Sequence, residues 1–239
     1  EILEAFLHQN GFLSIRDRDQ AGWSPICYAA MNGDPQLVEA LLSNGADPND
    51  CIFHAKSEAL IYAGTTVLAI AAGFGSNEVV RLLLCAKAKP NQRDSAVMGG
   101  GTSLHVTTLS DNAEGVRILL EARGDPSLRR AYPNDVLEIA CAMGAINVIK
   151  ELLPQKVTSQ HLLHWALINR GGSPDVISTL LLARMDPNEQ YYATRFRFKV
   201  AFSLFQAKNH ILKASQCSSW GTICYHLHGA TPLMLSMLS

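Results

Sequence analysis

Apolar residues between Ser24 and Asn49 recur at helical spacing in two short blocks. The first follows Ser24-Pro25, which suits a helix start because the hydroxyl can accept from free N–H groups and proline fits the first helical position. The second follows Asp34-Pro35 and ends at Gly45. The apolar positions are Ile26, Ala29, Ala30, Leu37, Val38, Leu41 and Leu42. Helices this short are marginal alone, so the pattern predicts a helix pair that needs neighbours to bury its apolar face.

The same pair of blocks recurs along the chain. With Ser24 as a phase marker, the matching positions are Thr66, Thr102, Asp135, His161 and Thr231. The second blocks recur in phase, among them LVEALLSNGADPN, EVVRLLLCAKAKPN, GVRILLEARGDPS and DVISTLLLARMDPN. Phase-matched recurrence of one helix pair predicts a solenoid, in which each unit is buried by the next.

The motif T-P-L-x-x-A-A, followed by a two-leucine helix and G-A-D-P-N, resembles the ankyrin repeat. This resemblance implies an all-α ankyrin-repeat solenoid of stacked helix-turn-helix units with finger loops and one long insertion. It places a partial repeat at 1–18, repeats at about 19–49, 61–91, 97–127, 130–154 and 159–188, an insertion at 189–228 and the start of a truncated repeat at 229–239. Residues 1–11 resemble the second helix of a repeat without its first, and residues 231–239 lack the polar face of a capping repeat. We therefore expect the chain to be part of a longer protein or a larger assembly.

The spacing between repeats is irregular. Asn49 and Thr66 are 17 positions apart, about nine more than a regular repeat needs, whereas Leu153 and His161 are only 8 apart. The finger before His161 is therefore expected to be missing or minimal. The insertion at 189–228 contains a strand-like stretch and a helix-like stretch. It could pack on the solenoid, dock another subunit, or serve as a weakly basic arm; the expected contacts are Phe196, Phe198, Phe202 and Phe205.

Composition and charge narrow the classes of protein. The 239 residues are 48% hydrophobic, which is too apolar for a disordered chain, and the formal charge of −1 provides no electrostatic footprint for nucleic acid. No apolar run is long enough to span a membrane. The six cysteines are scattered without a C-x-x-C motif, which favours a reducing intracellular compartment, cytoplasmic or nuclear.

Candidate chemistry is weak throughout. The glycine run from Met98 to Thr102 lacks the lysine and spacing of a phosphate-binding loop. Neither a serine-nucleophile elbow nor an H-E-x-x-H zinc motif is present, so no catalytic residue is expected. The densest group of metal-capable side chains has no standard zinc spacing: Cys217, Cys224, His226 and His228. We therefore predict no metal and no cofactor.

Several polar residues have structural roles implied by the resemblance. A histidine directly after T-P-L helps to hold the turn by hydrogen bonding, and His105 and His164 occupy that position. The asparagine that ends each repeat links neighbouring turns, as expected for Asn49, Asn91 and Asn188. These residues are therefore assigned to structure rather than to catalysis.

In proteins with this repeat, partners are held by finger tips and by the exposed side of each first helix. The face implied here is apolar and aromatic where a merely solvated face would be charged. Its expected residues are Gln20, Trp23, Met31, Asn32, Tyr62, Thr65, Phe74, Met98, Leu109, Ser110, Asn134, Met143, Ile168 and Asn169. The alternative is that the inserted loops fold over this face and bury it.

The expected function is a non-catalytic protein–protein interaction or scaffolding module that binds a partner protein or holds a subunit in a larger complex. No nucleic-acid partner and no membrane span within the chain are expected. The alternative is a regulatory segment of a larger enzyme or channel whose activity lies outside residues 1–239. Fold alone does not choose between these hypotheses.

Overall fold

The computed structural model of this protein describes residues 2–54, 63–94, 100–130, 135–155, 157, 159–168, 173–190 and 231–232. Within these ranges the secondary structure is helical, apart from an isolated antiparallel bridge between Cys51 and Thr66. The predicted all-α class is therefore confirmed. The predicted insertion contacts at Phe196, Phe198, Phe202 and Phe205 lie outside the described residues.

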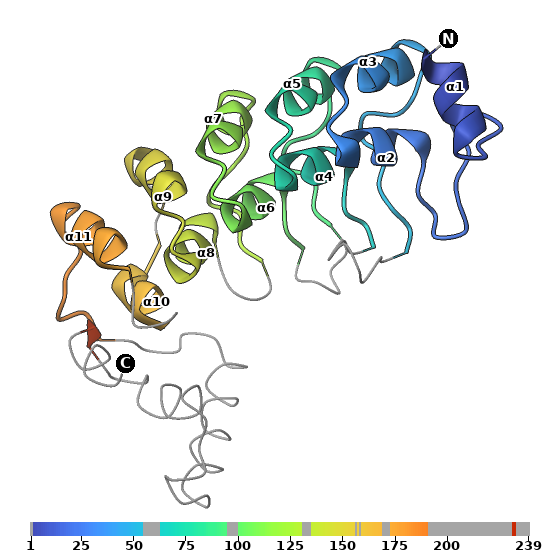
Figure 1. Ribbon diagram of the computed structural model, residues 1–239. Helices are drawn as coiled ribbons and strands as arrows, with labels where there is room; N and C mark the ends of the chain where they lie inside the picture. The colour runs from blue at the N-terminus through green and yellow to red at the C-terminus, as the bar shows by residue number, and fades with distance from the viewer. Residues whose placement is uncertain are drawn as a thin grey trace, which may run out of the picture.

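The helices alternate between two layers that run side by side along the solenoid (Figure 1). The first layer contains α2 (Pro25–Asn32), α4 (Val67–Gly73), α6 (Ser103–Leu109), α8 (Val136–Met143) and α10 (Leu162–Ile168). The second layer contains α1 (Ile2–Gln9), α3 (Pro35–Ser43), α5 (Asn77–Cys85), α7 (Ala113–Glu121), α9 (Ile146–Leu152) and α11 (Pro174–Leu182). Each helix packs on the next one in its own layer, so the fold grows by addition rather than around one centre.

Capping side chains define the starts of these short helices. Thr66 Oγ1 accepts a hydrogen bond from Ala69 N–H at 3.1 Å, and Thr102 N–H donates to His105 Nδ1 at 3.1 Å. Asp34 begins α3 in the same way, through Leu37 N–H. The predicted turn-holding role of His105 is confirmed. These caps satisfy N–H groups that a helix of two turns cannot pair internally.

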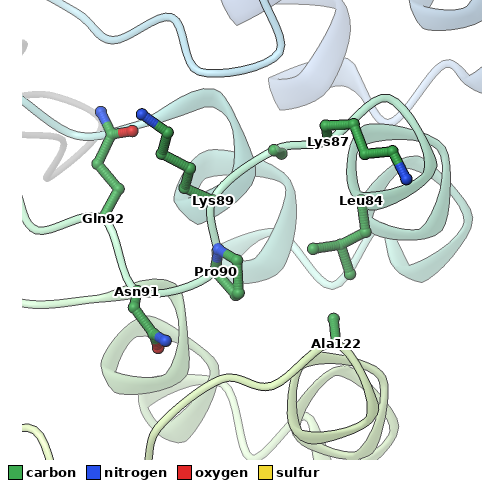
Figure 2. Close-up of a pocket in the computed structure, with 8 residues that line it drawn as sticks. Leu84, Lys87, Lys89, Pro90, Asn91, Gln92 and Ala122 are labelled. Carbon is green, nitrogen blue, oxygen red and sulfur yellow. The ribbon is translucent and has the colours of Figure 1, made fainter.

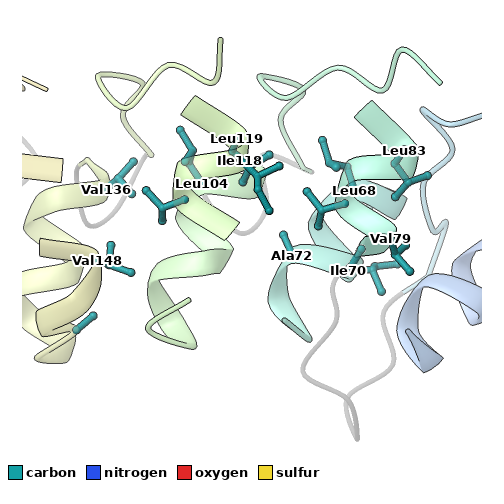
Figure 3. Packing of buried hydrophobic residues seen from close by; sticks show 14 of the residues in the cluster. Leu68, Ile70, Ala72, Val79, Leu83, Leu104, Ile118, Leu119, Val136 and Val148 are labelled. Atoms are coloured by element: carbon teal, nitrogen blue, oxygen red, sulfur yellow. The ribbon is translucent and has the colours of Figure 1, made fainter. Parts of the chain in front are cut away.

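The core lies between the two layers and continues from repeat to repeat (Figure 3). Leu68 and Leu104 from the first layer meet Leu83 and Leu119 from the second, and all are almost completely buried. Burying each such side chain stabilises the fold by roughly 1.5–3 kcal/mol. Since every core segment is completed by the adjacent repeat, packing between repeats supplies what the short helices lack alone.

Asparagines at the ends of repeats connect successive turns. Asn49 Oδ1 accepts from Lys89 N–H at 2.8 Å, and Asn91 Oδ1 accepts from Asp125 N–H at 2.7 Å. Asn91 Nδ2 also donates to the carbonyl of Arg123 at 3.0 Å. The linking role expected for Asn49 and Asn91 is thus confirmed, and these bonds form a ladder along the bases of the fingers.

Two positions after the end of α3, α5, α7 and α11, the backbone is left-handed. Gly45 adopts this conformation at φ 91°, but Lys87, Arg123 and Arg184 hold φ between 62° and 73° at the corresponding positions. A side chain in this region costs roughly 1–2 kcal/mol. Positive charge at a helix C-terminus recovers part of that cost through the helix dipole.

Candidate partner-binding surface

Three large apolar side chains lie exposed at the ends of successive first-layer helices. Phe74 caps the C-terminus of α4, while Leu109 and Met143 are the last residues of α6 and α8. Their exposed fractions are 53%, 54% and 51%. Because α4, α6 and α8 pack side by side, these ends follow one another along the solenoid. We call Phe74, Leu109 and Met143 the apolar row.

Other predicted site residues extend this surface with polar groups. Gln20, Asn32 and Ser110 are exposed, and Asn32 ends α2 at the position that Phe74 holds after α4. Met31 is only partly exposed because it packs against the core. The surface is thus polar at the first repeat and apolar at the next three.

Trp23 does not belong to this surface, and its prediction as an exposed anchor is wrong. Asp19 and Trp23 close a turn, with Trp23 N–H donating to Asp19 Oδ1 at 2.8 Å and Asp19 N–H to the Trp23 carbonyl at 2.9 Å. This turn directs the indole inward, where its ring lies 5.3 Å from that of Tyr28 and is fully buried. Trp23 is a core residue.

Thr65 is also buried, contrary to the prediction of an exposed position. Its carbonyl accepts from Ile52 N–H at 3.1 Å, beside the bridge between Cys51 and Thr66. This pairing closes the base of the long finger and covers the Thr65 side chain, which is 9% exposed. Among the remaining predictions, Tyr62, Met98, Asn134 and Asn169 lie outside the described residues, and for Ile168 only its place at the end of α10 is described.

Phe53 is an exposed aromatic residue that the sequence interpretation did not assign to the surface. The guanidinium carbon of Arg18 lies 3.9 Å from the centre of its ring, a cation–π arrangement. Arg18 also pairs with Asp50 and donates to the carbonyl of Cys51 at 3.0 Å. The sequence places Phe53 among the nine extra finger residues, but it does not show that Phe53 contacts Arg18, 35 positions earlier.

Buried charge is concentrated at the start of α8. The Glu138 carboxylate, 2% exposed as a side chain, lies 2.7 Å from an Arg129 nitrogen, and Asp135 lies 3.6 Å from the same nitrogen. Burial, reinforced by the Asp135 charge, raises the pKa of Glu138 to about 7, against the opposing effect of Arg129. This group lies inside the solenoid and stabilises a helix start, since Asp135 N–H donates to it. It has no access to a substrate.

A shallow hollow of about 900 Å³ opens between the C-terminal ends of α5 and α7 (Figure 2). Its lining residues are Leu84, Lys87, Ala88, Lys89, Pro90, Asn91, Gln92 and Ala122. The Asn91 amide is already bonded to Arg123 and Asp125, and Lys89 N–H to Asn49. The hollow therefore lies at the junction of two repeats. These polar groups, which could otherwise bind a ligand there, already form hydrogen bonds between neighbouring repeats.

The stacked helix pairs define the described part of the chain as a helical repeat solenoid. In the described residues, successive repeats carry exposed apolar side chains along one surface of the solenoid. In the part of the chain that the structure describes, no helix is long and apolar enough to cross a membrane.

Comparison with known proteins assigns the family. The family model described as ankyrin repeats in three copies matches residues 1–94 and 26–130. The chain belongs to the ankyrin-repeat family, whose repeats mediate protein–protein interaction and are typically non-catalytic.

The structure of the human ASB11 ankyrin repeat domain matches with a TM-score of 0.65 over 79% of this chain and 80% of that one. Because the two are only 22% identical, this likeness shows the fold alone. It confirms the predicted ankyrin-type solenoid.

Curated relatives share the repeats within longer proteins. The chain is 41% identical to a rat transient receptor potential cation channel, subfamily V member 5, over 86 residues, which are 34% of this chain and 12% of the channel. It is 33% identical to the Arabidopsis thaliana E3 ubiquitin-protein ligase XBAT33 over 97 residues, 41% of this chain and 17% of the ligase. Mouse NF-kappa-B inhibitor delta is 28% identical over 167 residues, 69% of this chain and 45% of that protein. The chain thus spans less than half of the length of these relatives.

Proposed function

We propose that this chain is a non-catalytic interaction module that binds a partner protein along its first-layer helices, with the apolar row as the centre of contact. One observation carries the proposal: Phe74, Leu109 and Met143 are each more than half exposed on successive repeats. Apolar anchors at regular spacing suit a partner with an apolar helix face or an extended segment. The polar residues Asn32 and Ser110 would form part of the rim.

The test begins with capture of a partner from native extract by the full chain, followed by binding measurements with the purified partner. Phe74→Ala and Leu109→Ala are expected to weaken binding by about 30-fold each, which corresponds to about 2 kcal/mol at an interface centre. Leu182→Ala is the matched control, since Leu182 is 84% exposed on α11 in the second layer. Equal dissociation constants for parent and both row variants would refute this location.

A second candidate function is regulation of an activity carried by a longer chain. It is supported by relatives named as a channel and as ubiquitin-protein ligases, whose similarity to this chain covers only 12% and 17% of their lengths. Under this proposal, the partner of the apolar row is a segment of the same polypeptide. Binding of the isolated chain to purified segments of the full-length protein tests it, and absence of binding by every segment would contradict it.

An intracellular reducing location forms part of the proposal. It is supported by Cys27, Cys51, Cys85 and Cys141 being free thiols. Burial raises the pKa of Cys27 to about 11, so this thiol is packed as a small hydrophobe rather than poised for reaction.

A further inference from the structure

The repeat register brings three separated positions to one place. In the first repeat these are Ser24 at the phase marker, Cys27 three residues later, and Asp50 directly after the D-P-N turn. Ser24 Oγ lies 3.3 Å from Cys27 Sγ and donates a hydrogen bond to the Asp50 carboxylate. We call this set of three positions the repeat node.

The fifth repeat has metal-capable side chains at all three positions of its repeat node. They are His161 at the phase marker, His164 three residues later, and Glu189 directly after Asp186-Pro187-Asn188. Their ligand atoms, one from each residue, all lie within 4.8 Å of one another. His161 Nδ1 is 3.0 Å from Glu189 Oε1, and the two imidazole rings meet edge to face at 5.4 Å.

From this geometry we infer that His161, His164 and Glu189 form a binding site for a divalent first-row metal ion, with Zn²⁺ as the best match. Zinc takes imidazole nitrogen and carboxylate oxygen at about 2.0–2.2 Å, so tetrahedral ligand atoms lie roughly 3.3 Å apart. The His161–Glu189 separation of 3.0 Å is within about 0.3 Å of this spacing, and His164 needs to move by about 1.5 Å at most. Two imidazoles disfavour Ca²⁺ and Mg²⁺, which prefer oxygen ligands.

Charge at the repeat nodes of the first and fourth repeats supports the inference. In the first repeat, Arg18 is six residues before Ser24 and pairs with the node carboxylate of Asp50. In the fourth repeat, Arg129 is six residues before Asp135 and pairs with Glu138. The corresponding residue in the fifth repeat is the uncharged Gln155. A metal cation bound by Glu189 and two imidazoles would take the place that arginine holds at these other nodes.

Burial gives the site its shape and its consequence. The His164 side chain is fully buried and that of His161 is 14% exposed, whereas Glu189 is 37% exposed. His161 and His164 are at the start of α10, and Glu189 follows α11. The metal would therefore fasten both ends of one helix pair and leave a fourth coordination position for water or a further side chain.

The experiment uses the full 239-residue chain, stripped with EDTA and titrated with Zn²⁺ at pH 7.5 against a chromophoric chelator. We expect one zinc per chain by elemental analysis and, with Co²⁺ as a probe, the visible absorption of a tetrahedral site. Glu189→Gln and His161→Asn are expected to weaken zinc binding by at least about 100-fold, since even loss of outer-shell partners costs 10–100-fold. Asparagine is chosen because it tolerates the left-handed backbone of His161, at φ 59°.

The decisive control replaces the other metal-capable group, with Cys217→Ser, Cys224→Ser, His226→Asn and His228→Asn in one variant. This variant is expected to bind zinc as tightly as the parent. Zinc binding that survives Glu189→Gln but is lost in the fourfold variant would overturn the assignment, as would a parent chain that binds no zinc. In the latter case His161 and Glu189 form an ion pair only. Far-UV circular dichroism of Glu189→Gln checks that the solenoid is folded.

Discussion

The buried carboxylate of Glu138 makes stability depend on pH in a direction opposite to that of most acidic residues. Its pKa rises from an ordinary 4.5 to about 7 in the folded protein, because burial and the neighbouring Asp135 disfavour the charged form. The folded state therefore holds this proton more tightly than the unfolded state. The resulting stabilisation is complete below pH 4.5 and is lost as the pH rises to about 7.

The magnitude follows from the shift. Each pKa unit corresponds to 1.36 kcal/mol, so ionising Glu138 lowers the free energy of unfolding by about 3 kcal/mol across this interval. Glu138→Gln keeps the shape and a hydrogen-bonding group but cannot ionise. We expect the variant to match the parent near pH 4.5 and to be about 3 kcal/mol more stable at pH 8.

Thermal unfolding followed by circular dichroism between pH 4.5 and 8 measures the difference. For a chain of this size, about 3 kcal/mol corresponds to a Tm higher by about 6–12 °C in the variant at pH 8. Glu114→Gln is the matched control, because that carboxylate is exposed and pairs with Arg81 on the surface; it should change stability by less than about 1 kcal/mol at any of these pH values. Curves of Tm against pH that run parallel for parent and Glu138→Gln would refute the reasoning.

Four further substitutions test other parts of the fold. Lys87→Gly and Arg123→Gly remove a side chain from a left-handed backbone, so each should raise the free energy of unfolding by about 1 kcal/mol in denaturant titrations; a loss of stability would contradict the assigned strain. Asn91→Ala breaks two bonds between repeats and should cost about 1–2 kcal/mol in the same assay, whereas an unchanged midpoint would mean that the ladder contributes nothing. Trp23→Ala should destabilise the chain by about 3–5 kcal/mol, because the indole is buried, and a variant as stable as the parent would show that it is not.

The sequence predicted the features that depend on local chemistry and on the period. Thr66 and Thr102 as helix starts, His105 as a turn residue and Asn91 as a link all follow from position within the repeat. Trp23 was misplaced because the residue before the phase marker belongs to the finger, and finger residues face either way according to the local turn. Burial of a single aromatic side chain is thus not set by the period.

Contacts between distant residues were the harder part to predict. Arg18 is 32 positions from Asp50, and His161 is 28 positions from Glu189. Neither spacing resembles a known ligand motif. Each pair can be identified only when corresponding positions of several repeats are compared. Local spacing instead singled out Cys217, Cys224, His226 and His228, because spacing along the chain does not show which distant residues the fold brings together.

The asparagine ladder has a mechanical consequence. It joins the finger bases as far as Asp125, but the next residue in register is Ser127, whose described bonds return to Asp125 within its own turn. At the opposite end of the helix pair, Asp111 accepts from Asn147 N–H at 3.1 Å and Val148 N–H at 3.0 Å. The third and fourth repeats are thus bonded to each other at the edge that holds Asp111. At the finger edge, the described bonds of Ser127 do not continue the asparagine ladder. Since Leu109 and Met143 lie beside the Asp111 edge, these bonds help to set the spacing between the two exposed side chains.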